Sequence, residues 1–164
     1  MNPSVCATGE PPLALEAECK SFHDRRVGQR TKDAERLEVP LFLSEFGACF
    51  DSENCEMEIG LVADACDDNL IGWGYWQFKN YWDLTTSAGT HSEGFYNNDG
   101  SVQQHKITAL SRTYMPYTQG VLKYMKFDRK TLGFRALFTL DTSIKAPTVL
   151  FNTVNIPLDK TGLP

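Results

Sequence analysis

The chain has 164 residues, enough for one ordinary domain or for one domain and part of another. Hydrophobic residues make up 41% of it and charged residues 23%, so the composition is globular and not disordered. The formal net charge of −5 argues against nucleic acid as a partner, and no run of about 18 apolar residues marks a transmembrane segment.

A helix is predicted over residues 13–37, because apolar positions recur there among many charged ones. Gly28 is expected to interrupt or kink this helix, and Pro40 to end it. Residues 41–46 follow as a predicted buried strand, since the stretch is almost entirely apolar up to Ser44.

A second helix and a second strand come next. Asp51 or Ser52 is a suitable N-cap, and four apolar residues fall on one helical face: Met57, Leu61, Val62 and Ala65. Residues 69–79 are rich in β-forming residues and glycine, which predicts the second strand.

The irregular segment 80–100 is long for a simple connection, and such segments are often binding loops or lids. Ser101 and Gln104 are spaced as a capping box, which predicts a third helix that includes Tyr114 and ends at Pro116. Helices and strands alternate up to this point, as they do in parallel α/β domains.

From about residue 117 the pattern changes to short strands. Three partly alternating segments are separated by turn residues, and they cover residues 121–128, 133–141 and 147–156. This order predicts an all-β domain after the α/β part.

Glu45 stands at the end of the first predicted strand, in the stretch VPLFLSEFGACF. A buried, isolated carboxylate is so costly that it is normally neutral, paired or functional. An acid after a strand more often simply faces solvent. In parallel α/β barrels, however, residues at the carboxyl ends of strands form the active site, and Glu45 occupies such a position.

Trp76 lies near the end of the second predicted strand. Trp73 and Trp76 are three residues apart, so on a strand they point to opposite faces. One of them can face a cleft while the other packs outward. A tryptophan beside a carboxylate is a common platform for a sugar ring, although core packing also explains it.

Five stretches together resemble the C-terminal part of the endoglycoceramidase-related glycoside hydrolases of family 5. In chain order they are CATGEPP, PLFLSEFGACF, GWGYWQFKNYWDLTT, SEGFYNNDGS and KITALSRTYMPYTQG. The resemblance runs from Cys6 to about Ile156. It implies an α/β fold: the C-terminal part of a (β/α)8 TIM barrel, from the end of strand six to helix eight, over residues 1–116. The beginning of a C-terminal all-β sandwich would follow over residues 117–164.

The resemblance also implies a retaining β-glycosidase. Such an enzyme uses two carboxyl groups about 5–5.5 Å apart, one as nucleophile and one as acid/base. Glu45 matches the nucleophile on strand seven, and Trp76 matches the aromatic floor of the sugar subsite at the cleaved bond. Lys79, His91 and Glu93 would flank the cleft as further substrate-binding residues.

The acid/base of this family lies in an Asn-Glu-Pro motif on strand four, and the chain contains no such motif. Glu10, in TGEP, is too close to replace it. Strands four and seven are separated by three βα units of roughly 30 residues each, whereas Glu10 lies only 35 residues before Glu45. The sequence therefore predicts part of a longer enzyme, and an isolated chain without hydrolase activity.

The predicted partner is a glycolipid or another β-glucoside, with peripheral contact to lipid where the substrate requires it. The alternatives are a sterol-glucoside or other family-5 β-glucan hydrolase, and, from another class, a non-catalytic carbohydrate- or lipid-binding module. The N-terminal stretch MNPSVCATGEPP lacks the basic and apolar regions of a signal peptide. Secreted, endolysosomal and membrane-peripheral locations stay open, as does the oligomeric state.

The five cysteines are Cys6, Cys19, Cys49, Cys55 and Cys66. An odd number leaves at least one outside any disulfide within the chain. Cys49 and Cys55 are spaced to close a short disulfide loop, but two buried thiols are an equal alternative. No cysteine pair has zinc-site spacing with histidines and no phosphate-binding glycine loop occurs, so neither metal nor cofactor is predicted. His23 and His105 are expected to have surface or packing roles.

Overall fold

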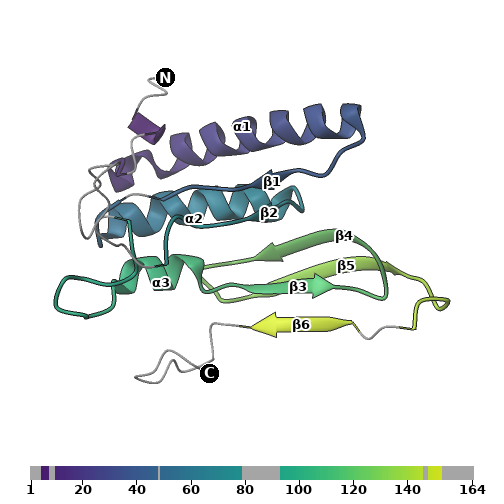
Figure 1. Cartoon of the computed structure of the whole chain (residues 1–164). Coiled ribbons are helices and arrows are strands. Elements are labelled where there is room, and N and C mark those ends of the chain that lie inside the picture. The colour runs from purple at the N-terminus through teal and green to yellow at the C-terminus, as the bar shows by residue number, and fades with distance from the viewer. Residues whose placement is uncertain (1–4, 8–9, 48, 79–92, 146–147, 153–164) are drawn as a thin grey trace, which may run out of the picture. The chain divides into compact units, whose positions relative to one another are not determined.

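Figure 1 shows the computed structural model of the chain, which describes residues 5–7, 10–47, 49–78, 93–145 and 148–152. They belong to two compact units, residues 1–110 and residues 111–164. The expected domain limit between residues 116 and 117 falls inside strand β3 (Thr113–Tyr117). The assignment of the two units to a partial barrel and a partial sandwich stays a prediction.

The first unit begins with two 3-10 turns, η1 (Val5–Ala7) and η2 (Leu13–Leu15), followed by helix α1 (Glu16–Leu37). The predicted helix is confirmed, but the expected interruption at Gly28 is wrong, because α1 runs through this residue. A glycine inside a helix lowers the stability of the helix by only about 1 kcal/mol relative to alanine, and the hydrogen bonds and packing of the surrounding turns outweigh this loss. The helix ends where Glu38 adopts a left-handed conformation and its N–H donates to the carbonyls of Ala34 and Glu35.

Helix α2 (Glu53–Asp68) separates two short strands, β1 (Phe42–Leu43) and β2 (Gly72–Trp73). The strands pair in parallel, with Phe42 opposite Gly72 and Leu43 opposite Trp73. Both are shorter than predicted, and β1 is not buried: Phe42 is exposed. Strand length depends on ladder partners, and within the described residues β1 and β2 form a sheet of only two strands.

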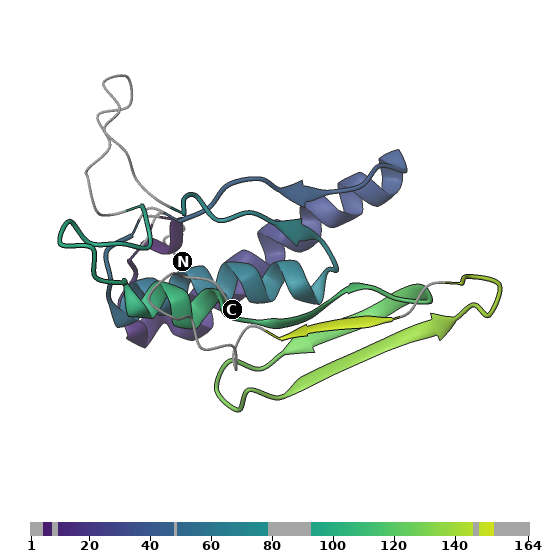
Figure 2. The same ribbon diagram turned by 60° about the horizontal axis from the view of Figure 1, so that its bottom comes forward.

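Two apolar clusters flank α2, which packs against α1 and against α3 (Gln104–Leu110) (Figures 1 and 2). One cluster joins α1 and α2 through Cys6, Cys19, Phe22, Met57 and Leu61. The other joins α2 and α3 through Cys49, Cys55, Ile59 and Ala109. Of the predicted apolar stripe on α2, Met57, Leu61 and Ala65 are buried and Val62 is half-buried.

Disulfides lie in both clusters. Cys6 pairs with Cys19, and Cys49 pairs with Cys55. For Cys49 and Cys55 the sequence allowed either a disulfide or two buried thiols, and the structure has the disulfide. Cys66 is a buried thiol in α2. Each bridge therefore ties the segment ahead of a helix to that helix, Cys19 lying in α1 and Cys55 in the first turn of α2.

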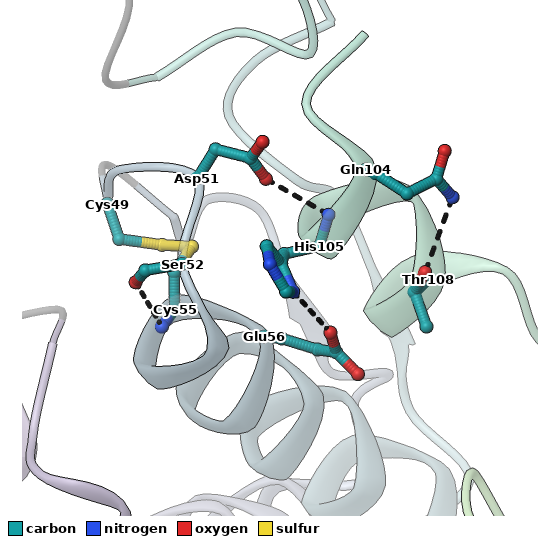
Figure 3. A network of polar contacts seen from close by, with 8 residues as sticks. All are labelled: Cys49, Asp51, Ser52, Cys55, Glu56, Gln104, His105 and Thr108. Atoms are coloured by element: carbon teal, nitrogen blue, oxygen red, sulfur yellow. Dashed lines mark hydrogen bonds and ion pairs between the residues drawn. A yellow bond between two sulfur atoms is a disulfide. The ribbon is translucent and has the colours of Figure 1, made fainter.

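A polar network connects the start of α2 to α3 (Figure 3). Ser52 caps α2, since its Oγ accepts a hydrogen bond from the Cys55 N–H, 3.1 Å away. Asp51 accepts from the His105 N–H at 3.0 Å, and His105 Nδ1 lies 2.7 Å from Glu56 Oε2. This bond to Glu56 raises the pKa of His105 above its ordinary value.

The predicted third helix is only partly right. Ser101 does not cap it, because its Oγ and its N–H both bond Asp99 Oδ1 in a local turn, and α3 begins at Gln104. The helix also ends at Leu110, and Tyr114 belongs to strand β3. Residues 113–117 form a strand and do not continue the helix, because β3 forms ladder hydrogen bonds with β6 (Val149–Asn152), a segment distant in the sequence.

The second unit consists of antiparallel strand pairs (Figure 1). Strand β4 (Gly120–Phe127) pairs with β5 (Phe134–Leu140) as a hairpin, and β3 pairs with β6. The first two predicted strand segments are therefore confirmed, and the described part of the third, residues 148–152, contains β6, whereas β3 is an additional strand. Asp128 shapes the hairpin turn by accepting the N–H groups of Lys130 and Thr131.

Candidate active site

A bulge lies at the carboxyl end of β1, where Glu45 is found. Leu43 pairs with Trp73, whereas the next bridge joins Gly47 to Trp76. Three residues, 44–46, therefore oppose two residues, 74 and 75. The backbone bonds agree, since Gly74 N–H donates to Leu43 O at 2.8 Å and Trp76 N–H donates to Phe46 O at 2.9 Å. Bulges of this kind occur beside active sites and redirect one side chain.

The bulge changes which side chains share a face. Beyond it, the Phe46 ring makes edge contacts with the rings of Trp73 and Tyr75, each at 5.7 Å between centroids. Neighbouring residues of an extended chain point to opposite sides. The ring contacts put Phe46, Trp73 and Tyr75 on one face, and regular alternation would direct their neighbours Glu45 and Trp76 toward the other face. Both are exposed, Trp76 at 44%.

Gly47 allows the two chain segments to approach closely. Its φ is +137°, and a Cβ at this position would lie 2.6 Å from Trp76 O and 2.6 Å from a ring carbon of Tyr75. A side chain would therefore push Trp76 away from the end of β1. This glycine follows Glu45 by two residues, so the backbone at Trp76 lies beside the segment that follows Glu45.

An aromatic layer supports the segment after β2. The Tyr75 ring stacks on Phe95 with 5.0 Å between centroids, and Phe78 makes edge contacts with Phe95 and Tyr96. Burial, assisted by the charge of Glu93, raises the pKa of Tyr75 above its ordinary range. Tyr75 therefore stays neutral over the physiological pH range.

Of the residues predicted to flank the cleft, Glu93 is described and is bonded to the residue after Trp76. Glu93 Oε2 accepts from Gln77 Nε2 at 3.1 Å, and Glu93 O accepts from the Gln77 N–H at 3.1 Å. Lys79 and His91 lie outside the described residues. Within the described part of the chain, Glu93 thus fixes the backbone beside Trp76.

Lys106 was not predicted as a feature of this region. It is fully buried in α3, and its Nζ donates to Gly94 O at 3.1 Å. Burial lowers its pKa to about 8, although the charges of Asp51, Glu10 and Glu93 act in the opposite direction. A lysine amid KITAL gives no sequence sign of burial, because its surroundings come from segments distant in the chain.

A cavity of about 330 Å3 lies beside β1 and between α1 and α2. Glu45 contributes to its wall, together with apolar residues of β1 and a buried pair of side chains, His23 and Glu58. His23 Nε2 lies 2.6 Å from Glu58 Oε1. The expectation of a packing role for His23 agrees with its burial. The prediction for His105 is refined, since this residue joins α3 to α2.

The described residues contain neither a membrane-spanning helix nor a cluster of metal-binding side chains. No helix in the described part of the chain has the length and apolar character needed to cross a membrane. Among residues 5–7, 10–47, 49–78, 93–145 and 148–152, no group of three or more histidine, cysteine, aspartate or glutamate residues is placed to hold a metal ion.

The arrangement of helices and strands is that of the endoglycoceramidase-related glycoside hydrolases, as the sequence motifs predicted. Endo-glycoceramidase II from Rhodococcus sp., solved as a lactosyl-enzyme intermediate, matches 87% of this chain at 19% identity with a TM-score of 0.64. Its complex with a cellobiose-like isofagomine matches 91% of this chain at 20% identity, also with a TM-score of 0.64. Sterylglucosidase 1 from Cryptococcus neoformans, solved with tris, matches 74% at 14% identity with a TM-score of 0.57.

The matches cover only part of each neighbour. This chain spans 30% of the first endo-glycoceramidase chain and 22% of the sterylglucosidase chain. No protein-family model matches the sequence, and no curated protein matches it. The comparisons therefore establish a shared fold over a part of those enzymes.

Proposed function

We propose that the chain contributes the nucleophile half of a retaining β-glycosidase that acts on glycolipids. The fold shared with endo-glycoceramidase II and sterylglucosidase 1 supports the reaction class. The observation that supports the proposal within the chain is the position of Glu45 and Trp76 just after two paired parallel strands, at their carboxyl ends.

In this mechanism the Glu45 carboxylate attacks the anomeric carbon while a second glutamate protonates the departing glycosidic oxygen. The glycosyl ester on Glu45 is then hydrolysed by water, whose proton returns to the second glutamate, and Glu45 is released as a carboxylate. The Trp76 ring would hold the sugar by stacking. Glu93, bonded to Gln77, would keep the backbone after Trp76 in place and would contact substrate only indirectly.

The second glutamate belongs to polypeptide beyond these 164 residues in this proposal. The matched part makes up 30% of the first endo-glycoceramidase chain and 22% of the sterylglucosidase chain. A sterol glucoside is the alternative substrate, favoured by the match to sterylglucosidase 1. A non-catalytic binding module is the alternative of another class, and exposed Trp76 would serve it as well.

The test uses the longer enzyme that contains this sequence, with a 2-fluoro β-glucoside that esterifies the nucleophile and is released slowly. Mass spectrometry of peptides should find the sugar on Glu45. Glu45→Gln should lower kcat by several orders of magnitude, whereas Glu35→Gln, a change at an exposed glutamate of α1, should leave it unchanged. A label on another residue, or a Glu45→Gln enzyme with normal turnover, would show that the nucleophile is misassigned.

A further inference from the structure

The hairpin of β4 and β5 (Figure 1) concentrates positive charge in an acidic chain. Residues 120–140 contain one acidic residue, Asp128, and five basic ones: Lys123, Lys126, Arg129, Lys130 and Arg135. The whole chain has 16 basic and 21 acidic residues, so the remainder has 11 basic and 20 acidic ones. Such an asymmetry within one chain is typical of segments that contact an anionic partner. The hairpin therefore has a local charge opposite in sign to that of the rest of the chain.

Two of these cations lie directly opposite each other on neighbouring strands. Lys126 of β4 pairs in register with Arg135 of β5, and both residues are exposed. Like charges in this arrangement repel each other and weaken the sheet. An anion that touches both side chains would remove this repulsion. The pair therefore has the arrangement of an anion-binding element.

The same pair lines an open groove of about 240 Å3 in the hairpin. The other lining residues are Tyr124 and the turn residues Asp128, Thr131 and Gly133. Asp128 is engaged in the turn, since its Oδ1 accepts the N–H groups of Thr131 and Lys130, at 3.1 and 2.8 Å. These bonds lower the pKa of Asp128, so it stays ionised. The groove therefore has room for a phosphate group that contacts two cations, with one carboxylate nearby that shapes the turn.

Exposed apolar side chains lie on the same face as the two cations. Residues two positions apart along a strand share a face, so Tyr124 and Leu137, which pair with each other, lie beside Lys126 and Arg135. Tyr124 is 40% exposed and Leu137 is 63% exposed. Phe127, the residue after Lys126, belongs to the other face and is buried. The face with the cations is therefore the solvent-exposed face of the hairpin.

We propose that this face of the hairpin docks on a lipid surface that contains anionic phospholipids. Lys126 and Arg135 contact headgroup phosphates, and Tyr124 and Leu137 enter the boundary between headgroups and acyl chains. Basic and apolar side chains together are typical of surfaces that lie in a membrane interface. A lipid surface fits better than an acidic protein, because it presents anionic groups directly above an apolar layer. The inference rests on the proposed function only where it makes this lipid surface the source of a glycolipid substrate.

Vesicle binding by the 164-residue chain tests the proposal. Vesicles of phosphatidylcholine alone are compared with vesicles that also contain phosphatidylserine, and bound protein is measured by sedimentation at low and at physiological salt. The test variant combines Lys126→Gln with Arg135→Gln. The control variant combines Lys32→Gln with Arg36→Gln, because it removes two exposed cations from α1 and has the same net charge.

The natural chain should bind the phosphatidylserine vesicles and not those of phosphatidylcholine alone, and its binding should weaken as salt rises. Each cation at an anionic membrane surface contributes about fivefold in affinity, so the test variant should bind about thirtyfold more weakly. The control variant should bind like the natural chain. Leu137→Ser should also weaken binding, because it removes apolar contact and no charge.

A probe at residue 137 locates the contact. Leu137→Cys is labelled with a dye whose emission rises and shifts to shorter wavelength in apolar surroundings. The label goes to this residue, because Cys66 is buried and the other four cysteines form two disulfides. The shift should appear with phosphatidylserine vesicles and not with phosphatidylcholine alone, and it is informative even if the double variant does not fold.

Three outcomes would overturn the proposal. Equal binding to both kinds of vesicle, or an equal loss in the two double variants, would mean that Lys126 and Arg135 are not the contact. Binding of inorganic phosphate without binding to vesicles would mean a site for a soluble anion. Binding of polyglutamate that needs the same two cations, with no dye signal on vesicles, would mean an acidic protein partner.

Docking and catalysis are tested separately, since none of these measurements involves hydrolysis. A failed vesicle test would leave the assignment of Glu45 standing. A non-catalytic Glu45 would in turn leave the docking result unaffected.

Discussion

Glu45 and Trp76 follow two paired parallel strands, and a local change in strand pairing lies between the strands and these residues. Regular alternation from Leu43 would place Glu45 on the same side as Leu43, facing the helices. The three-against-two pairing of residues 44–46 with residues 74 and 75 interrupts this alternation. The candidate site thus depends on a bulge, and Gly47, with its positive φ, is the residue that makes the close return to Trp76 possible.

Gly47→Ala tests this dependence. A Cβ at residue 47 would lie 2.6 Å from Trp76 O, and the backbone would have to leave a φ that alanine disfavours. We expect a loss of about 2–3 kcal/mol in the free energy of unfolding, with a change in tryptophan fluorescence. Denaturant titration followed by fluorescence measures both effects.

Gly28→Ala is the matched control. At Gly28, in the middle of α1, the nearest atom to a new Cβ is Asn69 Oδ1 at 3.9 Å, so the space is open. This change should raise the stability by about 0.5–1 kcal/mol, because alanine favours the helix. If Gly47→Ala were as well tolerated as Gly28→Ala, the close approach at Trp76 would not be structurally important.

At the scale of elements, α2 is the centre of the first unit. One side of it packs on α1 and the other on α3, and Ser52 and the Cys49–Cys55 disulfide define its start. Helix α3 has only seven residues, too few to be stable alone. Its attachment comes from His105, bonded to α2, and from Lys106, bonded to the backbone at Gly94.

Lys106 should make the stability depend on pH. Its pKa is about 8 in the folded state and 10.5 ordinarily, so between these values the unfolded state binds more protons and stability rises with pH. From pH 7 to pH 9.5 the gain should be about 2 kcal/mol. Tyr75, whose pKa is raised by burial, acts in the opposite direction only near and above pH 10.

Lys106→Met should remove this gain, because methionine does not titrate. Lys123→Met, a change at an exposed lysine of β4, should leave it in place. Urea titrations of the three proteins at pH 7 and pH 9.5 make the comparison. An equal pH dependence in Lys106→Met and the natural chain would rule out Lys106 as its source.

At the scale of the whole molecule, the chain corresponds in fold to part of a much larger enzyme. It spans 30% of endo-glycoceramidase II and 22% of sterylglucosidase 1. A retaining glycosidase needs two carboxyl groups about 5–5.5 Å apart, and in the proposed mechanism only the nucleophile comes from these residues. Under this proposal the isolated chain would contain a nucleophile without its acid/base.

The isolated 164-residue chain should accordingly show no hydrolysis of a fluorogenic β-glucoside above buffer. A β-glucoside whose leaving group needs no protonation, such as dinitrophenolate, should still transfer its sugar slowly to Glu45 and form the ester there, provided that the sugar binds. Fluorimetry and intact-protein mass measure the two steps. Turnover of the fluorogenic substrate that vanished in Glu45→Gln would contradict the prediction and would mean that an acid/base lies within the chain.

Much of this molecule follows from local sequence patterns. The helices α1 and α2, the N-cap Ser52 and the hairpin of β4 and β5 could be predicted, because their hydrogen bonds join residues near in sequence. The motifs around Glu45 and Trp76 also indicated the likeness to endo-glycoceramidases that the structural comparison finds. Their catalytic and binding roles stay proposals.

Only the tertiary structure decided the features that join distant segments. These are the Cys6–Cys19 disulfide, the strand β3 in place of a longer third helix, the bulge beside Glu45, the burial of Lys106, and the pair of His23 with Glu58. Periodicity tells which face of an element is apolar, but not which partner covers it. Register and burial depend on contacts between residues about 12 or more positions apart, and a pattern within one segment contains no information about them.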